Sequence, residues 1–360
     1  MSSELAPQLA SALAVGRFET LRRRPVLLVV GGFVVLAAAV ILGIVLGTVT
    51  VPIGDTLAIL AHRLLGWDGP QTWAASSETI VVDLRLPRVL AAMAVGTGLA
   101  VAGAAFQGVL RNPLADPYVL GTASGAALGA SIAVLVPVTF VLLGFGLLHL
   151  LAFAGAVGAV ALVYRLSQAT TLTSLSGLLL TGYAVGSLLA AGLALAMYLS
   201  GAGLRQIFFF LLGGFGQANW PQVLTGIPLI LVGSVLIATR ARSLNALLLG
   251  EDAATHLGID VRRERLVLLG LGSLVTAAAV AVGGLIGFVG LVVPHVVRLL
   301  VGPNARLVVP LAGLFGASFL VFADLIARIP GELPVGIVTA VIGAPFFLAL
   351  LRRARGGYES

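Results

Sequence analysis

Residues 85–129 read RLPRVLAAMAVGTGLAVAGAAFQGVLRNPLADPYVLGTASGAALG and place a short charged and Pro/Asn-rich segment between two long apolar segments dense in glycine. The first apolar segment, from Val89 to Leu110, carries no charged residue over 22 positions. A helix of about 20 apolar residues crosses a bilayer core of about 30 Å, whereas a helix on the surface of a water-soluble protein shows one polar face. The sequence therefore predicts a membrane span here.

The composition extends this interpretation to most of the chain. Of 360 residues, 59% are hydrophobic and 10% are charged, and the mean hydropathy is +1.12. Such a chain has too little polar surface to cover a water-soluble globule. Because the long uncharged runs lack the two-residue alternation of barrel strands, we expect helices rather than a closed barrel. The sequence predicts an all-α, polytopic membrane protein.

The uncharged stretches divide into ten predicted spans. The longest, residues 117–164, is expected to break near Pro137 and Gly144, and the stretch 266–297 near Gly283. The predicted helices cover residues 25–47, 88–110, 117–136, 143–164, 174–198, 219–239, 265–282, 285–300, 306–326 and 334–351. They would form one transmembrane domain over residues 25–355, with a lead-in of residues 1–24 and a tail of residues 356–360. The first apolar run is too long for a signal-peptide core, so its helix is predicted to be retained.

The arginines orient this bundle. Ten spans put both termini on one side, and if that side is the cytoplasm only five of the 21 basic residues lie outside: Arg63, Arg85, Arg88, Arg205 and Arg328. The other sixteen lie inside, which is the bias that the positive-inside rule describes. We therefore predict a multi-pass protein of the cytoplasmic (inner) membrane with both termini in the cytoplasm.

Several kinds of chemistry are excluded by what the chain lacks. It has no cysteine, its four histidines are scattered, and no catalytic or metal-ligand motif is apparent, so we expect no cofactor, no metal site and no enzymatic activity. Since it also has no lysine, it cannot carry a P-loop and cannot hydrolyse ATP itself. The arginines flank apolar spans and do not form one basic face, which argues against nucleic-acid binding.

The largest polar loop on the predicted inner side, residues 240–265, mixes apolar and charged residues at helical spacing. Ser243 would cap a short helix that ends near Leu249, and a second helix would begin near Glu251. Exposed apolar side chains are expected at Leu244, Leu247, Leu248, Ala254 and Leu257. The loop fits either a docking surface for a soluble partner or a helix pair lying on lipid headgroups.

Six motifs give the chain a specific resemblance. They are RLPR at 85–88, QGVLRNPLADPYVLG at 107–121, GGFGQANW at 213–220, LLLGEDAATHLGI at 247–259, GFVGLVVPHVVR at 287–298 and ELPVGIVTAVIGAPFF at 332–347. With these motifs in this order, residues 83–355 resemble the permease subunits of type II ABC importers for iron-siderophore, haem and vitamin B12, the FecCD/BtuC-type family. This resemblance favours a docking surface at residues 240–265.

The resemblance implies an assembly: a homodimer of ten-helix subunits, two cytoplasmic ATPase subunits, and a periplasmic or lipid-anchored substrate-binding protein outside. It implies that Arg85, Arg88 and Arg328 pair with carboxylates of the binding protein, although the link after Arg328 is shorter here than in several relatives. Residues 244–258 would form coupling helices that contact the ATPase, with candidate contacts at Leu247, Gly250, Glu251, Asp252, Ala254, Leu257 and Gly258. The candidate pathway or gate residues are Gln107, Ser174, Leu175, Ser176 and Phe209.

The predicted function is that of an importer permease for a metal chelate, an iron-siderophore first, with haem and vitamin B12 or cobinamide as alternatives. An ion-coupled secondary carrier would fit the same span count, but such carriers need carboxylates within the membrane. The sequence places Asp116 and Asp324 at or near span ends. A membrane-embedded enzyme is less consistent still, because no acidic or histidine residues converge within the spans.

Overall fold

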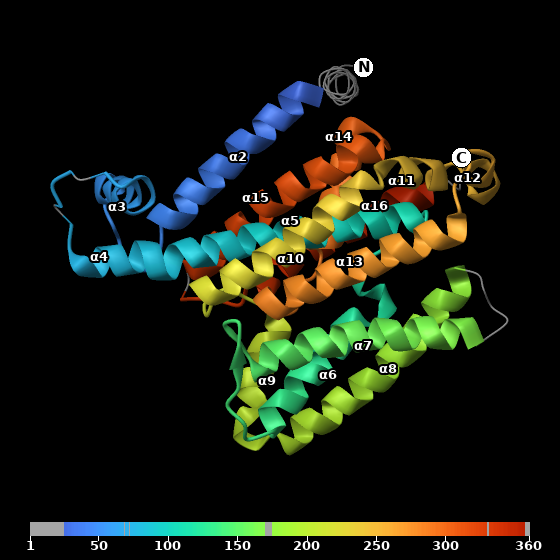
Figure 1. The fold of residues 1–360 in the computed structure, drawn as a ribbon, viewed down its shortest axis with the longest axis horizontal. Helices are drawn as coiled ribbons and strands as arrows, with labels where there is room; N and C mark the ends of the chain where they lie inside the picture. The colour runs from blue at the N-terminus through green and yellow to red at the C-terminus, as the bar shows by residue number, and fades with distance from the viewer. Residues whose placement is uncertain (1–24, 68, 72, 170–174, 330, 357–360) are drawn as a thin grey trace, which may run out of the picture.

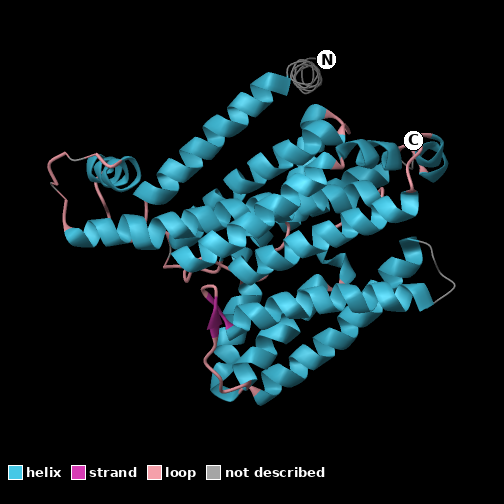
Figure 2. Ribbon diagram, in the orientation of Figure 1, coloured by secondary structure: helices cyan, strands magenta, loops and turns pink. Residues whose placement is uncertain are grey.

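The structure is a computed structural model that describes residues 25–67, 69–71, 73–169, 175–329 and 331–356. Nearly all of this part is helical, and a short hairpin of β1 (Val141–Leu142) and β2 (Phe145–Gly146) is its one sheet (Figure 2). The predicted all-α architecture is confirmed.

Each of the ten predicted spans corresponds to a helix. Seven are long and apolar enough to cross a membrane: α2 (Pro25–Val45), α5 (Leu86–Val109) with the turns before it, α7 (Leu147–Ala169), α8 (Leu175–Leu199), α10 (Trp220–Thr239), α13 (Val261–Gly283) and α15 (Ala305–Arg328). The other three are α6 (Thr122–Leu135), α14 (Val289–Val301) and α16 (Val335–Gly356), of which α6 and α14 are short. The polytopic fold follows from these ten apolar helices.

Within the described residues, three further α-helices and three helical turns were not predicted as such. Before α5 lie α3 (Ile53–Leu65) and α4 (Ala75–Thr79), which a π-helical turn, η1 (Ile80–Arg85), joins to α5. A 3-10 turn, η2 (Pro117–Leu120), precedes α6, and η3 (Gly201–Gly203) leads into α9 (Leu204–Leu212). Their charged or short sequences do not reach span length, and length was the signal used to predict spans.

The core is built around α5, which α10, α13, α14 and α15 surround (Figure 1). Glycine permits two close crossings of α5. A Cβ on Gly103 would lie 1.8 Å from the carbonyl oxygen of Gly290 in α14, and a Cβ on Gly96 would lie 2.2 Å from that of Gly316 in α15. Small residues let membrane helices approach at backbone distance, which replaces the hydrophobic driving force that lipid removes.

A second group consists of α6, α7, α8 and α9 and lies below the first in Figure 1. Here too glycine sets the crossing, because a Cβ on Gly125 would lie 2.3 Å from the Gly155 carbonyl oxygen. Contacts of α13 with α7 and α6 join the two groups. One end of each group borders the pocket described below.

Candidate functional site

The three arginines predicted for docking lie close to one another at the end of the bundle where α2 ends and α5 begins. Arg88 Nε donates to Asp324 Oδ1 at 3.0 Å, and its Nη1 donates to Glu332 Oε1 at 3.3 Å. Arg328 Nε donates to the other oxygen of Asp324 at 2.8 Å. The Asp324 side chain is fully buried between two guanidinium groups, so the pair is charge-assisted and shielded from water.

The remaining arginine donors bind the end of α2. Arg85 Nη1 donates to the carbonyls of Ile44 and Val45 at 2.8 and 2.7 Å, its Nη2 donates to Val49 O, and Arg328 Nη1 donates to Gly43 O at 2.8 Å. The last carbonyls of a helix have no partner within the helix, and a cation there also complements the helix dipole. Arg85 and Arg328 therefore hold α2 against α5 and α15.

This geometry differs from that of freely exposed docking side chains. Arg85, Arg88 and Arg328 are only 6%, 8% and 3% exposed, and each is bonded within its own chain. Neither acidic partner, Asp324 or Glu332, was predicted from the sequence. Asp324 could have been found from its i,i+4 spacing to Arg328 on one helix, whereas the pairing of Glu332 with Arg88 links distant segments and has no local signal.

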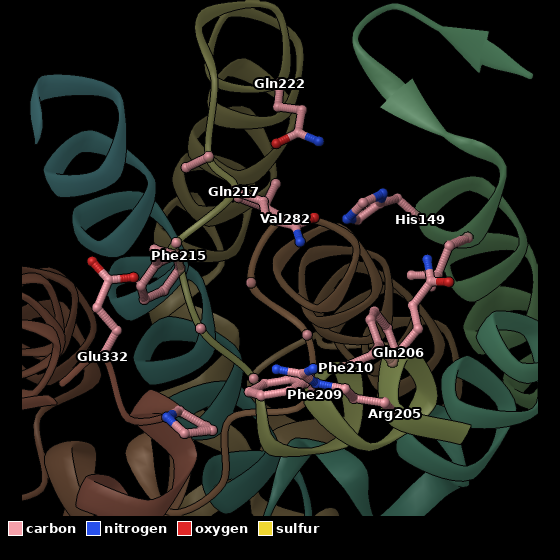
Figure 3. Close-up of a pocket in the computed structure, with 18 of the residues that line it drawn as sticks. His149, Arg205, Gln206, Phe209, Phe210, Phe215, Gln217, Gln222, Val282 and Glu332 are labelled. Carbon is pink, nitrogen blue, oxygen red and sulfur yellow. The ribbon is translucent and has the colours of Figure 1, made fainter. Parts of the chain in front are cut away.

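A pocket of about 740 Å³ opens beside this cluster, between the two helix groups. Figure 3 shows His149, Gln206, Gln217 and Gln222 around its space, with Glu332 on another wall. Nδ1 of His149 has no hydrogen-bond partner within the described residues. Arg205 lies 5.6 Å from the ring centroid of Phe209, the aromatic residue predicted for the pathway. The walls thus combine amide, imidazole and aromatic surface, a pattern typical of ligand pockets.

Two glycines shape the floor of this pocket. Gly213 and Gly284 have φ values of +63° and +70°, which favour glycine, and their backbones nearly touch. Gly214 N donates to Gly283 O at 2.8 Å and Val335 N donates to Gly213 O at 3.0 Å. These bonds join the link after α9, the end of α13 and the start of α16, so the pocket has a fixed base.

The other candidate gate residues are not brought together. Gln107 is 1% exposed and is bonded to α14: its Nε2 donates to Leu291 O at 3.1 Å, and its Oε1 accepts from Arg298 Nη1 at 2.8 Å. It therefore connects two packed helices and is not among the residues that line the pocket. Leu175 and Ser176 begin α8, while Ser174 lies outside the described residues.

The loop at 240–265 contains the two short helices expected, α11 (Ala241–Leu248) and α12 (Glu251–His256), with Gly250 at φ +115° between them. The expected capping by Ser243 is wrong, because α11 begins at Ala241. The expected exposure is also wrong for Leu244, Leu247 and Ala254, which are buried in the core. The apolar face of α11 packs under α5, where Leu244 contacts Gly108.

The exposed part of this loop is narrower than predicted. Leu249 and Leu257 are 71% and 63% exposed, and Glu251 and Asp252 are exposed between them. Glu251 bonds to Arg265 of α13 and lies 3.5 Å from Arg111, which follows α5. The hydrogen bond from Arg265 is the main cause of a lowered pKa for Glu251. The carboxylate thus connects α12 to two helices of the core.

The segment after α5 holds one perturbed carboxyl group. Asp116 accepts a hydrogen bond from Tyr118 N at 2.8 Å and caps η2. Burial raises the pKa of Asp116 to about 6, despite the opposing effect of that hydrogen bond.

Within the described residues, no group of three or more acidic or histidine side chains is placed to hold a metal ion.

Comparisons with known proteins agree with this architecture. Residues 34–353 match the model of the FecCD transport family. The chain is 42% identical to the cobalamin import system permease protein BtuC of Halobacterium salinarum, over 84% of this chain and 85% of that one. It is also 42% identical to the hemin transport system permease protein HmuU of Yersinia pestis, over 77% and 84%.

A solved structure extends the similarity to the fold. It represents an inward-facing conformation of a proposed metal-chelate type ABC transporter, with a TM-score of 0.78 and 32% sequence identity. The match covers 91% of this chain and 99% of that one. The family match over residues 34–353 spans the segments that form the arginine cluster, the pocket beside it and the loop of α11 and α12.

Proposed function

The chain belongs to the FecCD transport family, and from that premise we propose that it forms the pathway by which an ATP-driven importer carries an iron-siderophore through the cytoplasmic membrane. It is a multi-pass permease of an importer for metal chelates, haem or vitamin B12. The observation that supports the proposal most is that the similarity runs through all ten apolar helices and through the loop of α11 and α12. Haem and vitamin B12 or cobinamide are the alternative cargoes, because relatives carry those names.

We assign the pocket beside the arginine cluster to the outer side of the membrane, as the place where cargo enters, and call it the outer pocket. Its polar side chains, including His149 and Gln206, offer donors and acceptors to the edge of a chelate, and Phe209 offers an aromatic face. The pocket is lined by five separate segments that belong to both helix groups, so that a change in the spacing of the two groups would change the pocket. A pathway needs binding weak enough for release, which a large pocket with few charges provides.

We assign the arginine cluster to docking of a substrate-binding protein. Arg88 is the most suitable first contact, because its partner Glu332 has a side chain that is 56% exposed. A carboxylate of the binding protein would replace Glu332, and deeper engagement of Arg85 and Arg328 would require them to release the end of α2. Charge-assisted pairing suits such reversible docking.

We assign the surface formed by Leu249, Gly250, Glu251, Asp252, Leu257 and Gly258 to contact with a cytoplasmic ATPase subunit. Leu247 and Ala254 would act beneath that surface, since both are buried. A displacement of α12 would be transmitted to α13 through Arg265 and to the end of α5 through Arg111. The ATPase hydrolyses ATP, because this chain has no lysine for a P-loop.

Assembly follows the same proposal. Both termini lie in the cytoplasm by the arginine distribution. The apolar faces of α8 and α16 are widely exposed, including Leu188, Tyr198 and Val341. A second copy of the chain would cover part of them, and lipid would cover the rest, which agrees with a homodimer around a central pathway.

An ion-coupled carrier is the second candidate, because Asp324 is a fully buried carboxylate in an apolar helix. Two arginines already neutralise it, which leaves it poorly suited to bind a proton or a sodium ion. Reconstitution with a cognate ATPase and binding protein tests both candidates, by following uptake of a labelled ferric siderophore, haem and cobalamin in parallel. We expect ATP-dependent uptake of the siderophore. Faster uptake of haem or cobalamin would change the cargo alone, whereas uptake driven by an ion gradient without nucleotide would contradict the importer.

A further inference from the structure

A second cavity lies away from the outer pocket, between α7 and α13. Its volume is about 460 Å³, and its walls include Val157 and Ala161 of α7 and Leu266, Leu269 and Ser273 of α13. The two helices lie side by side in Figure 1. The lining residues place the cavity toward the end where α7 finishes and α13 starts. Gly270 is part of the wall, and a Cβ there would meet nothing within 4 Å. The cavity is therefore apolar and open between two membrane-spanning helices.

Two arginines lie one helical turn beyond residues that line the cavity. Arg165 follows Val157 and Ala161 at successive four-residue steps on one face of α7, and Arg262 precedes Leu266 by four residues on α13. Both side chains are exposed, and neither has an ion pair in the described part of the chain. Other arginines nearby differ, because Arg240 and Arg265 are paired with Glu264 and Glu251.

We propose that this cavity binds an anionic glycerophospholipid, with one acyl chain between α7 and α13 and its phosphate between Arg165 and Arg262. An apolar space at this depth is next to hydrocarbon and offers almost no polar partner to water. Unpaired arginines at its mouth complement a phosphate, and basic pockets between spans on the cytoplasmic side bind anionic headgroups. The lipid would stabilise the contact between the two helix groups where α7 meets α13.

The proposal requires only that α7 and α13 span a bilayer, so it does not depend on what the protein transports. Its occupant has both an acyl chain and a negative headgroup. Phosphatidylglycerol should therefore bind more tightly than phosphatidylcholine with the same chains, and inorganic phosphate should not compete at comparable concentration. Equal binding of the two lipids would overturn the assignment of the arginines.

Native mass spectrometry of the full chain released from detergent, with added phosphatidylglycerol, tests the site. The double variant Arg165→Gln/Arg262→Gln should bind the lipid about 30-fold more weakly, because each basic side chain near an anionic headgroup contributes about a fivefold factor. The matched control Arg242→Gln/Arg263→Gln removes the same charge from exposed arginines on α11 and on another face of α13. An equal loss in the control would show general surface attraction and would contradict a defined site.

A volume-filling variant tests the acyl-chain part separately. Gly270→Leu should fill the cavity and reduce binding of phosphatidylglycerol at least tenfold, while the arginines remain. Gly158→Leu is its control, since Gly158 on α7 also has open space around it but is not part of the cavity wall. Should Gly270→Leu fail to fold, Ala161→Phe fills the same space from the other helix. Unchanged binding in a folded filling variant would overturn the proposal.

Discussion

Arg88 and Asp324 form a buried ion pair between α5 and α15, with Arg88 Nε 3.0 Å from Asp324 Oδ1, although 236 positions separate them in sequence. Arg328 bonds to the same carboxylate. Three charged side chains thus share one dry site, in which both arginines depend on the single carboxylate of Asp324 for their buried counter-charge. Removal of one of these side chains should lower the free energy of unfolding by more than the loss of its own hydrogen bonds suggests.

Asp324→Ala should lower the free energy of unfolding by about 3–5 kcal/mol, because it leaves two buried arginines without a counter-charge. Thermal unfolding of the purified permease in detergent measures the change. Glu332→Gln is the matched control, since Glu332 is exposed and its pairing with Arg88 should contribute about 1 kcal/mol or less. Similar losses in the two variants would contradict a dominant role for the buried pair.

Glu332→Gln should also tighten docking of the cognate binding protein about two- to fivefold. The variant frees Arg88 from its exposed partner, so an incoming carboxylate no longer competes with Glu332. Surface plasmon resonance with the permease in nanodiscs provides the affinity. Weaker docking in this variant would mean that Glu332 itself contacts the binding protein or that Arg88 does not.

Gly103→Ala should reduce stability by about 1–3 kcal/mol, because the added Cβ would lie 1.8 Å from the Gly290 carbonyl oxygen and force α5 away from α14. Gly31→Ala is the control: nothing lies within 4 Å of its Cβ, so the better helix former should leave stability unchanged or raise it slightly. Thermal unfolding and the yield of monodisperse protein measure both variants. A neutral Gly103→Ala would show that this crossing is looser than described.

Asp116 should make stability depend on pH. Burial raises its pKa to about 6 in the folded protein, whereas the unfolded chain releases the proton near pH 4. Between these values the folded state binds more protons, so the contribution of Asp116 to the free energy of unfolding falls as pH rises from about 4 to about 6. Asp116→Asn keeps the helix cap but cannot titrate. As pH rises from about 4 to about 6, the melting temperature of the variant minus that of the natural protein should increase by a few degrees. A difference that stays constant over this pH range would refute the raised pKa of Asp116.

The positions of the spans could be predicted from the sequence. An uncharged run of bilayer length is long enough to cross the hydrocarbon core as a helix, and it has little polar surface to face water. The two short helices at α11 and α12 could also be predicted, since Gly250 and the acidic start of α12 are local signals. Exposure could not. Leu244 and Leu247 are apolar residues of a polar loop, and only the tertiary position of α11 under α5 shows that they are buried.

Arg85, Arg88 and Arg328 show the same limit. The arginine distribution predicts their side of the membrane, but their partners depend on how α2, α5 and α15 meet. The pairing of Asp324 with Arg328 could have been predicted from their helical spacing. The carbonyls of Gly43, Ile44 and Val45 are backbone groups, so no pattern of side chains indicates them as partners. The pocket beside the arginine cluster could not be predicted either, because five segments far apart in sequence form it.

The central claim is that a separate ATPase subunit binds the exposed surface around α12. The chain has no cysteine, so Leu257→Cys gives a single reactive thiol on that surface, and Val141→Cys gives a similarly exposed control in the β1–β2 hairpin. Thiol-directed cross-linking in the assembled complex should join position 257, but not position 141, to the ATPase. If position 257 forms no such cross-link in an active complex, or if it reacts with a membrane-impermeant thiol reagent applied outside intact cells, the account is contradicted.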